Sequence, residues 1–208
     1  MKREDRFFEK MLLEAEKNVT KLLKKEGMIA GEVFHTQREY IKRKKGVKGL
    51  DAFVKKSEEL GYKFDLRKVE YRGWQAIGLR PFSWLVMLRA FGWGREELID
   101  SGYQAPQVSF IMRILVGYFV SSEVTIRRSP SYWKKHYSVG NLSVSLVDMK
   151  NKKFVLMIDD FEISPLFCTF YLGYFKRVVE FGGIKNSEVK EIKCMFKGDD
   201  YHEFEITW

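Results

Sequence analysis

The sequence predicts an α+β fold in which helices cover an antiparallel sheet. Three observations predict it: apolar residues at helical spacing in the first half, alternating strand-like runs in the last 70 residues, and one strongly apolar helix between two pairs of strands. The 208 residues are 45% hydrophobic, which is enough for one sizeable core, and no repeat or Pro/Ser-rich linker divides them. We therefore expect one domain over residues 1–208, mainly helical over 1–135 and strand-strand-helix-strand-strand over 136–208.

The first half contains several predicted helices. Residues 4–25 place apolar side chains three and four positions apart, and further helical stretches are expected over 32–45 and 49–60. A strand is expected within "FDLRKVEYRGW", residues 64–74, because its side chains alternate in polarity. The chain from residue 80 to residue 120 is expected to be mostly helical again.

The last part is expected to form the sheet. "NLSVSLVDM" and "KKFVLMIDDF" read as a hairpin, and "SEVKEIKCMFKGDDYHEFEITW" supplies two more strands. Between them, "ISPLFCTFYLGYFKRVVEFGG" is predicted to be a helix that begins near Ser164 and ends at Gly182. This helix is apolar on most sides, so we expect it to be buried.

The last two strands are expected to form a hairpin with an apolar inner face. Side chains alternate along a strand, and the apolar set on both arms is even-numbered: Ile192, Cys194, Phe196, His202, Phe204 and Ile206. A three-residue loop, 198–200, keeps both sets on one face and pairs Cys194 with Phe204. Cys194 and His202 would then be diagonal neighbours, about 7 Å apart at Cβ.

Three potential metal ligands are expected to converge on that face. Cys168 lies in the first turns of the buried helix, which packs on the same face as Cys194 and His202. Two thiolates and an imidazole suit zinc. The alternative stays open, because free cysteines and an inward histidine are also ordinary core residues. Two cysteines in a chain of this length do not predict a disulfide framework.

Residues 164–206 resemble the 4-vinyl reductase-like small-molecule-binding domains, whose superfamily includes haem nitric-oxide sensors and TRAPP-type Golgi transport subunits. The matching positions in this sequence are Cys168, Gly173, Cys194, Gly198, Asp199, Glu203 and Phe204, with His202 where the family has a further cysteine. The resemblance covers about 45 residues. It implies helices around a twisted antiparallel sheet, a homodimer, and an interior pocket for an apolar ligand.

The leading functional hypothesis is a non-enzymatic sensor or accessory domain that binds a small apolar or lipid-like molecule. No serine elbow, phosphate loop, dinucleotide fingerprint or paired His-Glu metal motif is present, so enzymatic activity is not predicted. Pockets for such ligands are mainly apolar. The aromatic residues that we expect to line the pocket are Trp84, Phe110, Tyr118, Phe167 and Tyr171.

The sequence argues against haem. The haem branch of the superfamily uses a proximal histidine on a mid-chain helix and a Tyr-x-Ser-x-Arg signature, and neither pattern is present. The histidines of the chain are His35, His136 and His202. From the sequence we expect no required cofactor, with zinc as the candidate metal.

A basic interaction module is the main alternative. Such a module would bind nucleic acid or a protein partner. The net charge of +9 is concentrated in residues 1–100, and the run Lys42, Arg43, Lys44 and Lys45 offers a phosphate-binding patch for nucleic acid or an anionic membrane surface. The competing interpretation is a solvated helix end whose cations complement the helix dipole, and we favour it. The apolar stretches are too short for a membrane span and the amino terminus is unlike a secretory signal, so a cytoplasmic location is expected.

Overall fold

A computed structural model of the chain describes residues 3–108 and 123–208, and within these ranges it consists of helices, one small sheet and one larger sheet. The helices of the first half are α1 (Arg3–Lys17), α2 (Val19–Leu23), α3 (Glu32–Lys45), α4 (Lys48–Glu59), α5 (Leu79–Phe91) and α6 (Arg95–Val108). The short strands β1 (Met28–Ala30) and β2 (Trp74–Ala76) pair antiparallel among them. The second half contains α8 (Glu123–Arg128), α9 (Pro130–His136), β3 (Asn141–Asp148), β4 (Lys153–Asp159), α10 (Leu166–Phe181), β5 (Glu188–Lys193) and β6 (His202–Thr207).

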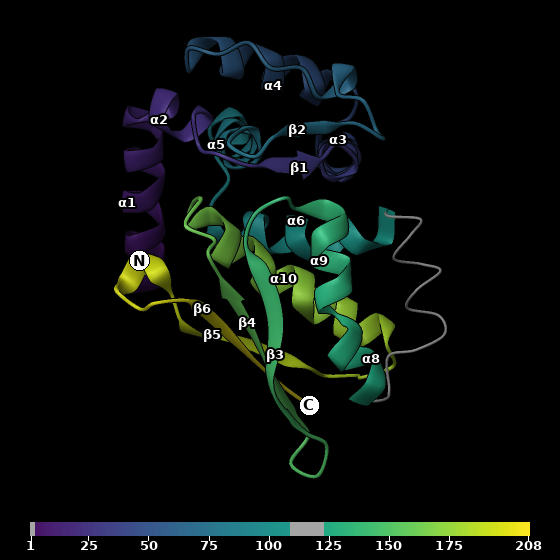
Figure 1. Cartoon of the computed structure of the whole chain (residues 1–208). Coiled ribbons are helices and arrows are strands. Elements are labelled where there is room, and N and C mark those ends of the chain that lie inside the picture. Colours follow the sequence, from purple (N-terminus) through teal and green to yellow (C-terminus); the bar gives the residue numbers. More distant parts are fainter. Residues whose placement is uncertain (1–2, 109–122) are drawn as a thin grey trace.

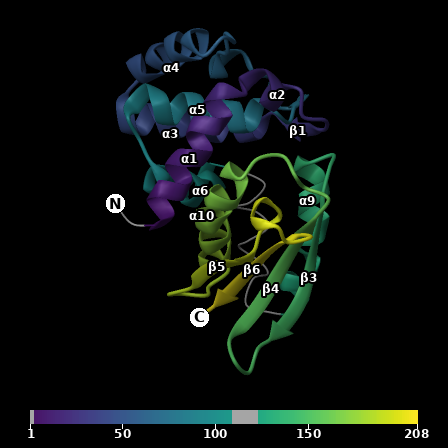
Figure 2. The ribbon, with the colours of Figure 1, turned by 90° about the vertical axis from the view of Figure 1, so that its left-hand side faces the viewer.

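The molecule has a helical half stacked on a half that contains the larger sheet. Figure 1 shows α2 to α5 and the small β1-β2 sheet above the four antiparallel strands, whose order is β3-β4-β6-β5. Helices α6 and α10 pack closely together, and α10 also contacts β5. On the other side, α8 and α9 contact β3, so helices flank the sheet at both edges (Figure 2). The predicted α+β fold with an antiparallel sheet is confirmed.

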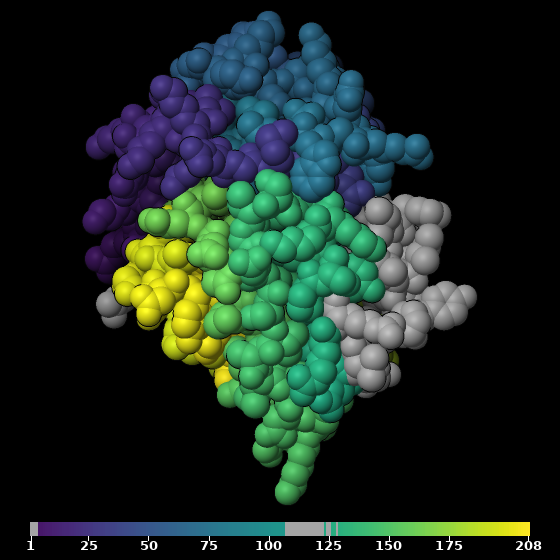
Figure 3. Space-filling model, viewed as in Figure 1, coloured from purple at the N-terminus to yellow at the C-terminus, as the bar shows by residue number. Residues whose placement is uncertain are grey.

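The space-filling view shows how the two halves meet. The helical half, in purple and blue, sits directly on the green and yellow half, and the β3-β4 hairpin projects from the far end (Figure 3). Their shared core includes the large buried side chains Trp84, Phe82, Phe161 and Phe167. Removing such rings from water supplies most of the driving force for joining the layers.

Two elements of the first half differ from the sequence prediction. The expected helix over 4–25 is divided into α1 and α2 at Asn18, whose side-chain amide donates to the carbonyl of Glu14 at 2.9 Å and so competes with the helical pattern. The expected strand over 64–74 is also wrong for most of its length. Asp65 accepts a 3.0 Å hydrogen bond from the backbone N–H of Arg67, which favours a 3-10 turn over Leu66–Lys68, and the strand begins only at Trp74.

The terminal hairpin forms, but its register differs from the predicted one. Glu191 pairs with Phe204 and Lys193 pairs with Glu203, so the strand carries a bulge between residues 191 and 193. The chain after Cys194 makes a 3-10 turn over Met195–Lys197 instead of extending the strand. The predicted pairing of Cys194 with Phe204 is therefore wrong.

The bulge changes which side chains face inward. Because one extra residue is inserted, the alternation of side chains shifts by one position after Glu191. Ile192, which we expected on the inner face, is 50% exposed, whereas Cys194 is buried. Glu191 and Cys194, three positions apart, both point to the face that carries His202 and Phe204.

Helices α6 and α10 approach each other through two glycines. A Cβ atom added at Gly173 would overlap the carbonyl oxygen of Ile99, and one added at Gly102 would overlap the carbonyl oxygen of Phe170. Each helix therefore presents its glycine to the backbone of the other. This close crossing fixes the position of α10, from which Cys168 and several cavity residues project.

Within the ranges that the structure describes, none of the helices combines the length and apolar character required to span a bilayer.

Candidate functional site

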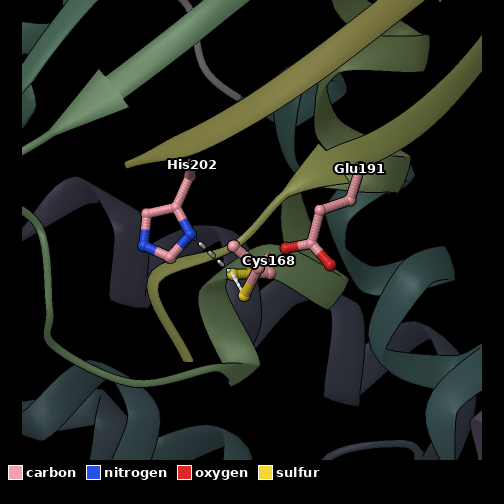
Figure 4. Close-up of side chains that lie close together, drawn as sticks. Cys168, Glu191 and His202 are labelled. Carbon is pink, nitrogen blue, oxygen red and sulfur yellow. Dashed lines mark hydrogen bonds between the residues drawn. The ribbon is translucent and has the colours of Figure 1, made fainter. Parts of the chain in front are cut away.

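The first candidate site is a cluster of cysteine, histidine and carboxylate side chains between the sheet and the start of α10. The sulfur atoms of Cys168 and Cys194 are 3.8 Å apart, and Cys168 Sγ lies 3.4 Å from His202 Nδ1. Figure 4 shows Cys168, His202 and Glu191 pointing toward one another. The three residues named from the sequence as potential metal ligands thus lie together in the structure.

Glu191 is the fourth member of the cluster. One ligand atom from each of Cys168, Glu191, Cys194 and His202 lies within 4.8 Å of the others. Glu191 Oε2 pairs with Lys197 at 2.5 Å, but Oε1 is buried and has no hydrogen-bond partner in the described part of the chain. A buried carboxylate oxygen without a partner is costly, so its presence points to a ligand that the cluster can hold.

The hydrogen bonds around the cluster orient its members. His202 Nε2 lies 3.3 Å from the carbonyl oxygen of Phe161, an arrangement in which Nε2–H donates and Nδ1 is left as an acceptor facing Cys168. Metal-ligating histidines are commonly held in this way through their other nitrogen. The backbone N–H of Cys194 donates to Asp199 Oδ2 at 2.8 Å, which holds the loop after β5 in place.

The two thiols titrate differently. The hydrogen bond with Cys194, together with burial, raises the pKa of the Cys168 thiol well above its ordinary value. The same contact lowers the pKa of Cys194 to about 6. Cys194 is thus the more acidic thiol of the pair, and a thiolate is the form that binds a metal.

A groove connects the cluster with the amino-terminal helix. It has a volume of about 690 Å³ and is lined by α1 residues, including Phe8 and Met11, and by Cys168, Glu191 and Cys194. The cluster is therefore buried but borders an open space, which gives an ion a route to it.

The second candidate site is an interior cavity where the helical half meets the sheet. Its volume is about 160 Å³, and its walls come from α3, α5, α6, α8, α9, α10 and the strands β3 and β4. Most of the lining is apolar or aromatic, with Trp133, Phe154, Leu156, Tyr171 and Phe175 among the contributors. An apolar, aromatic-lined space at the boundary of two layers is the usual character of a small-molecule site.

The residues expected from the sequence to line a pocket have different positions. Tyr171 lines the cavity. Trp84 and Phe167 are buried and contact each other, with ring centroids 4.8 Å apart, but neither is among the described residues of the cavity wall. Phe110 and Tyr118 lie outside the described residues.

Arg80 is a charged residue in the cavity wall that is not among the residues expected from the sequence to line a pocket. It is 2% exposed, and its Nη1 donates to Gln37 Oε1 at 2.8 Å. Its guanidinium carbon lies 4.5 Å from the ring centroid of Trp84 and 5.2 Å from that of Phe170. A desolvated cation–π contact contributes roughly 2 kcal/mol, whereas burying an ion costs several kcal/mol.

The charge on Arg80 is therefore only partly offset by the contacts that surround it. Burial lowers the pKa of Arg80 to about 10. The guanidinium consequently remains protonated at neutral pH. A signal for this residue was present in the sequence: α5 is apolar on nearly all sides, so a charge in its first turn has no polar face on which to lie.

His136 and Glu32 form an ion pair at the edge of the same cavity. His136 Nε2 lies 2.5 Å from Glu32 Oε1, and Nδ1 lies 3.0 Å from the carbonyl oxygen of Tyr132. Although burial disfavours the imidazolium, the hydrogen bond to Glu32 raises the pKa of His136 above its ordinary value of 6.5. The hydrogen bond to His136 in turn lowers the pKa of Glu32. The pair joins α9 to α3 and so ties the sheet half to the helical half.

We expect this pair to make stability depend on pH. His136, whose pKa is raised, stabilises the folded protein at low pH. This stabilisation is lost as pH rises through the pKa of His136 in the folded protein, which lies above 6.5. The Glu32 carboxyl, whose pKa is lowered, loses its effect as pH falls below about 4.5. Urea unfolding of Glu32→Gln at pH 6 should therefore show a loss of about 2 kcal/mol relative to the wild type, since a hydrogen bond to a charged group is removed.

The loss should shrink by pH 9, because His136 loses its charge as pH rises through its pKa. Glu14→Gln, a change at an exposed helical carboxylate, is the matched control and should give a small difference that does not vary with pH. An effect of Glu32→Gln that is equal at pH 6 and pH 9 would contradict the pairing of charges.

The basic run at the end of α3 is largely engaged within the protein. Lys42 pairs with Glu39 at 3.1 Å and Lys44 with Asp100 at 2.9 Å, while Lys45 lies over the Trp93 ring at 5.4 Å. Arg43 is exposed. These contacts favour the interpretation as a solvated helix end over a nucleic-acid surface.

Three residues that shape the two sites were missed from the sequence: Glu191, His136 and Arg80. Glu191 stands three positions before Cys194. In a regular strand this spacing would place the two side chains on opposite faces, and the bulge brings them to the same face. His136 had a weaker signal, since it is one of three histidines and closes an aromatic helix, α9.

Comparison with known proteins shows the fold. No family model matches the chain, and no curated protein matches it. An H-NOX protein from S. oneidensis in the Fe(II)NO ligation state aligns with a TM-score of 0.65 and 13% identity over 86% of this chain and 98% of the other. A single-residue mutant of the Fe(II) unliganded H-NOX protein from K. algicida aligns with a TM-score of 0.61 and 14% identity, over 86% of this chain and 96% of the other. An oxygen-binding H-NOX domain related to soluble guanylate cyclases aligns with a TM-score of 0.57 and 11% identity, over 86% of this chain and 94% of the other.

One sequence-based expectation is corrected by these matches. A further matched structure, with a TM-score of 0.58 and 11% identity over 86% of this chain and 95% of the other, is described by the words "Modulating Heme Redox Potential Through Protein-Induced Porphyrin Distortion". The expectation that argued against haem is therefore wrong, because it relied on short motifs and the fold is shared at identities of 10–14%. The finer resemblance to 4-vinyl reductase-like domains and TRAPP-type subunits stays a prediction. What is shown is that this chain adopts the fold of the matched H-NOX structures.

Proposed function

We propose that this protein is a sensor-type domain whose small-molecule ligand occupies the cavity between the helical half and the sheet. The observation that carries the proposal is an aromatic-lined cavity of about 160 Å³ whose wall also contains polar groups with unused hydrogen-bonding capacity. Those groups include Tyr171 Oη and Ser129 Oγ, both buried without a partner within the described ranges. A cavity that were merely a packing defect would be lined by satisfied or apolar atoms.

The cavity also offers a way to transmit binding. Its walls come from both halves, and the His136–Glu32 pair joins those halves at its edge. A ligand that contacts both walls stabilises one relative arrangement of the halves over others, which is what a sensor requires. A homodimer and a cytoplasmic location stay predictions that belong to this proposal.

Haem is a second candidate occupant of the cavity, because the description of a matched structure names it. The donor chemistry of the cavity wall fits: histidine and tyrosine are both ligands of haem iron, and Arg80 is a partner for a carboxylate side group. In this chain one of the lining tyrosines would hold the iron, because both ring nitrogens of His136 are already engaged, and Arg80 would hold the carboxylate. Bound haem would supply an iron centre for a diatomic gas. Because the cavity is of single-ring size, the walls would have to separate to admit a porphyrin.

A ligand panel tests the proposal. The purified protein is titrated with haemin, benzoate, benzamide, benzyl alcohol and octanoate, with thermal unfolding and, for haemin, absorption spectroscopy as readouts. We expect at least one compound to raise Tm in a saturable way, since a ligand that binds only the folded state stabilises it. A Soret shift that saturates at one haemin per chain would identify haem as the occupant. No binding by any member of the panel would overturn the proposal.

A further proposal concerns the cluster of Cys168, Glu191, Cys194 and His202, which we propose to be a zinc site. Two thiol sulfurs, one imidazole nitrogen and one carboxylate oxygen make a four-ligand set of the kind that zinc takes in tetrahedral sites. The unpartnered oxygen of Glu191 and the orientation of His202 by the Phe161 carbonyl both support it. Elemental analysis of protein prepared without chelator should give about one zinc per chain.

A further inference from the structure

The interior cavity contains a buried positive charge without an acidic partner in the described part of the chain. Arg80 is 2% exposed and its one hydrogen bond to a side chain goes to the neutral amide of Gln37. Gln37 Oε1 also accepts from Ser83 Oγ at 2.7 Å, so the amide is fixed in place and holds the guanidinium in one orientation. The charge is thus positioned by a neutral network that does not neutralise it.

The carboxylate that shares this cavity wall is already engaged. Glu32 lines the cavity, but its Oε1 lies 2.5 Å from His136, and the two charges balance each other. The pKa of Glu32 is lowered and that of His136 is raised, which is the pattern of a matched ion pair. The net charge that remains in the cavity is that of Arg80.

Two hydroxyl groups near Arg80 add donor capacity. Tyr137 and Tyr171 lie close enough to Arg80 to influence its titration, and both line the cavity. Burial raises the pKa of both phenols, so each is a neutral hydroxyl that can donate a hydrogen bond. Tyr137 also affects the titration of Tyr171, yet Tyr171 Oη is buried and makes no hydrogen bond of ordinary geometry among the described residues. A cation and two neighbouring phenolic hydroxyls at one place suit an anionic oxygen.

We propose, building on the ligand-binding function proposed above, that the cavity takes a small monocarboxylic acid with an apolar body of about one aromatic ring, whose carboxylate pairs with Arg80 and accepts a hydrogen bond from Tyr171. The size follows from the volume of about 160 Å³, because a cavity of roughly 150 Å³ holds benzene. The charge follows from Arg80, since guanidinium groups pair with carboxylates in a bidentate way. The aromatic wall accommodates the ring.

A carboxylate on an apolar body has two sources that share this chemistry, a free monocarboxylic acid and the side groups of a haem. The experiment separates them. Isothermal titration calorimetry compares benzoate with benzamide, which has nearly the same shape but no charge, and haemin is titrated in parallel. We expect benzoate to bind the wild type about ten-fold or more tightly than benzamide, because only the anion compensates the buried cation.

Arg80→Met removes the charge while keeping an apolar side chain of similar length. We expect it to bind benzoate about ten-fold or more weakly than the wild type and benzamide with little change. Arg89→Met is the matched control, because Arg89 pairs with Glu9 and Glu16 on α1 and is not among the described residues of the cavity wall. It should leave the preference for benzoate intact. Tyr171→Phe is a smaller change that provides a test even if Arg80→Met does not fold. It should weaken the binding of benzoate more than the binding of benzamide.

The outcomes are distinct. Equal affinity of the wild type for benzoate and benzamide would overturn the carboxylate inference and leave the ligand-binding proposal standing. Binding of haemin alone would overturn the small monocarboxylate. Binding of neither benzoate nor benzamide, while another member of the panel raises Tm, would overturn the one-ring carboxylate inference alone, and no binding by any member of the panel would overturn both. A preference for benzoate that Arg80→Met abolishes and Arg89→Met preserves would support the inference.

Discussion

We expect Cys194→Ser to lose its zinc and to unfold at a Tm roughly 10 °C below that of the wild type. Cys194 is the more acidic thiol of the cluster, and serine replaces a strong metal ligand by a hydroxyl that does not ionise at neutral pH. If the affinity falls by about 1,000-fold, about 4 kcal/mol of ligand-linked stability is lost. For a chain of this size that corresponds to roughly 10 °C. Elemental analysis and differential scanning calorimetry measure the two effects.

Chelator separates the loss of metal from the cost of the substitution itself. A buried serine in place of cysteine costs about 1–3 kcal/mol without any metal, through desolvation of its hydroxyl. EDTA should therefore lower the Tm of the wild type but leave that of Cys194→Ser unchanged. Equal sensitivity of both proteins, or wild-type protein without stoichiometric zinc, would sink the metal proposal.

Histidine variants provide a matched pair. His202→Gln removes the imidazole of the cluster, whereas His35→Gln changes a partly buried histidine on α3 that contacts Arg38. We expect zinc content to fall in the first variant and to be unchanged in the second. A parallel loss in both would mean that general destabilisation, and not ligation, removes the metal.

The sequence predicts the sheet half well because its signals are local. The alternation in residues 141–159 and the apolar character of residues 166–181 each specify an element without reference to distant contacts. The first half was less predictable at its breaks. Asn18 and Asp65 redirect the backbone through their own side-chain hydrogen bonds, and such local competition leaves the apolar spacing unchanged.

The sequence predicts the convergence of Cys168, Cys194 and His202, but the strand register on which that prediction relies differs from the observed one. Strict alternation placed Cys194 opposite Phe204, whereas the bulge before Lys193 sets the true register. Bulges depend on how a strand must curve to pack, which alternation does not encode. Glu191 reaches the cluster only through that bulge, so it could not be found from a strand template.

The cavity could be predicted in kind but not in detail. A pocket was expected, and Tyr171 lies in its wall. Arg80 and the His136–Glu32 pair come from segments far apart in the sequence, and the two members of the pair are separated by 104 positions. Such pairs arise from how the two halves are stacked, and no periodic pattern reports that arrangement.

Gly173→Ala is expected to destabilise the protein by about 3 kcal/mol or more, although alanine is the better helix former. The added methyl group would overlap the carbonyl oxygen of Ile99 and lie 2.8 Å from the backbone nitrogen of Tyr103. Both are backbone atoms, which cannot move aside as the end of a flexible side chain can. Gly94→Ala, where the added Cβ meets only Glu97 Oε2 at 3.9 Å, is the control and should cost less than about 1 kcal/mol.

The variant also links the helix crossing to both sites. Cys168 precedes Gly173 on α10, and Phe170, Tyr171 and Tyr174 line the cavity from the same helix. If α10 must move away from α6, the ligand atoms of the zinc cluster and the wall of the cavity move with it. The free energy of unfolding in urea, the zinc content and the benzoate affinity of Gly173→Ala should then fall together, while those of Gly94→Ala stay close to the wild-type values. A Gly173→Ala protein with wild-type stability would mean that the two helices are not held at the close crossing on which both sites depend.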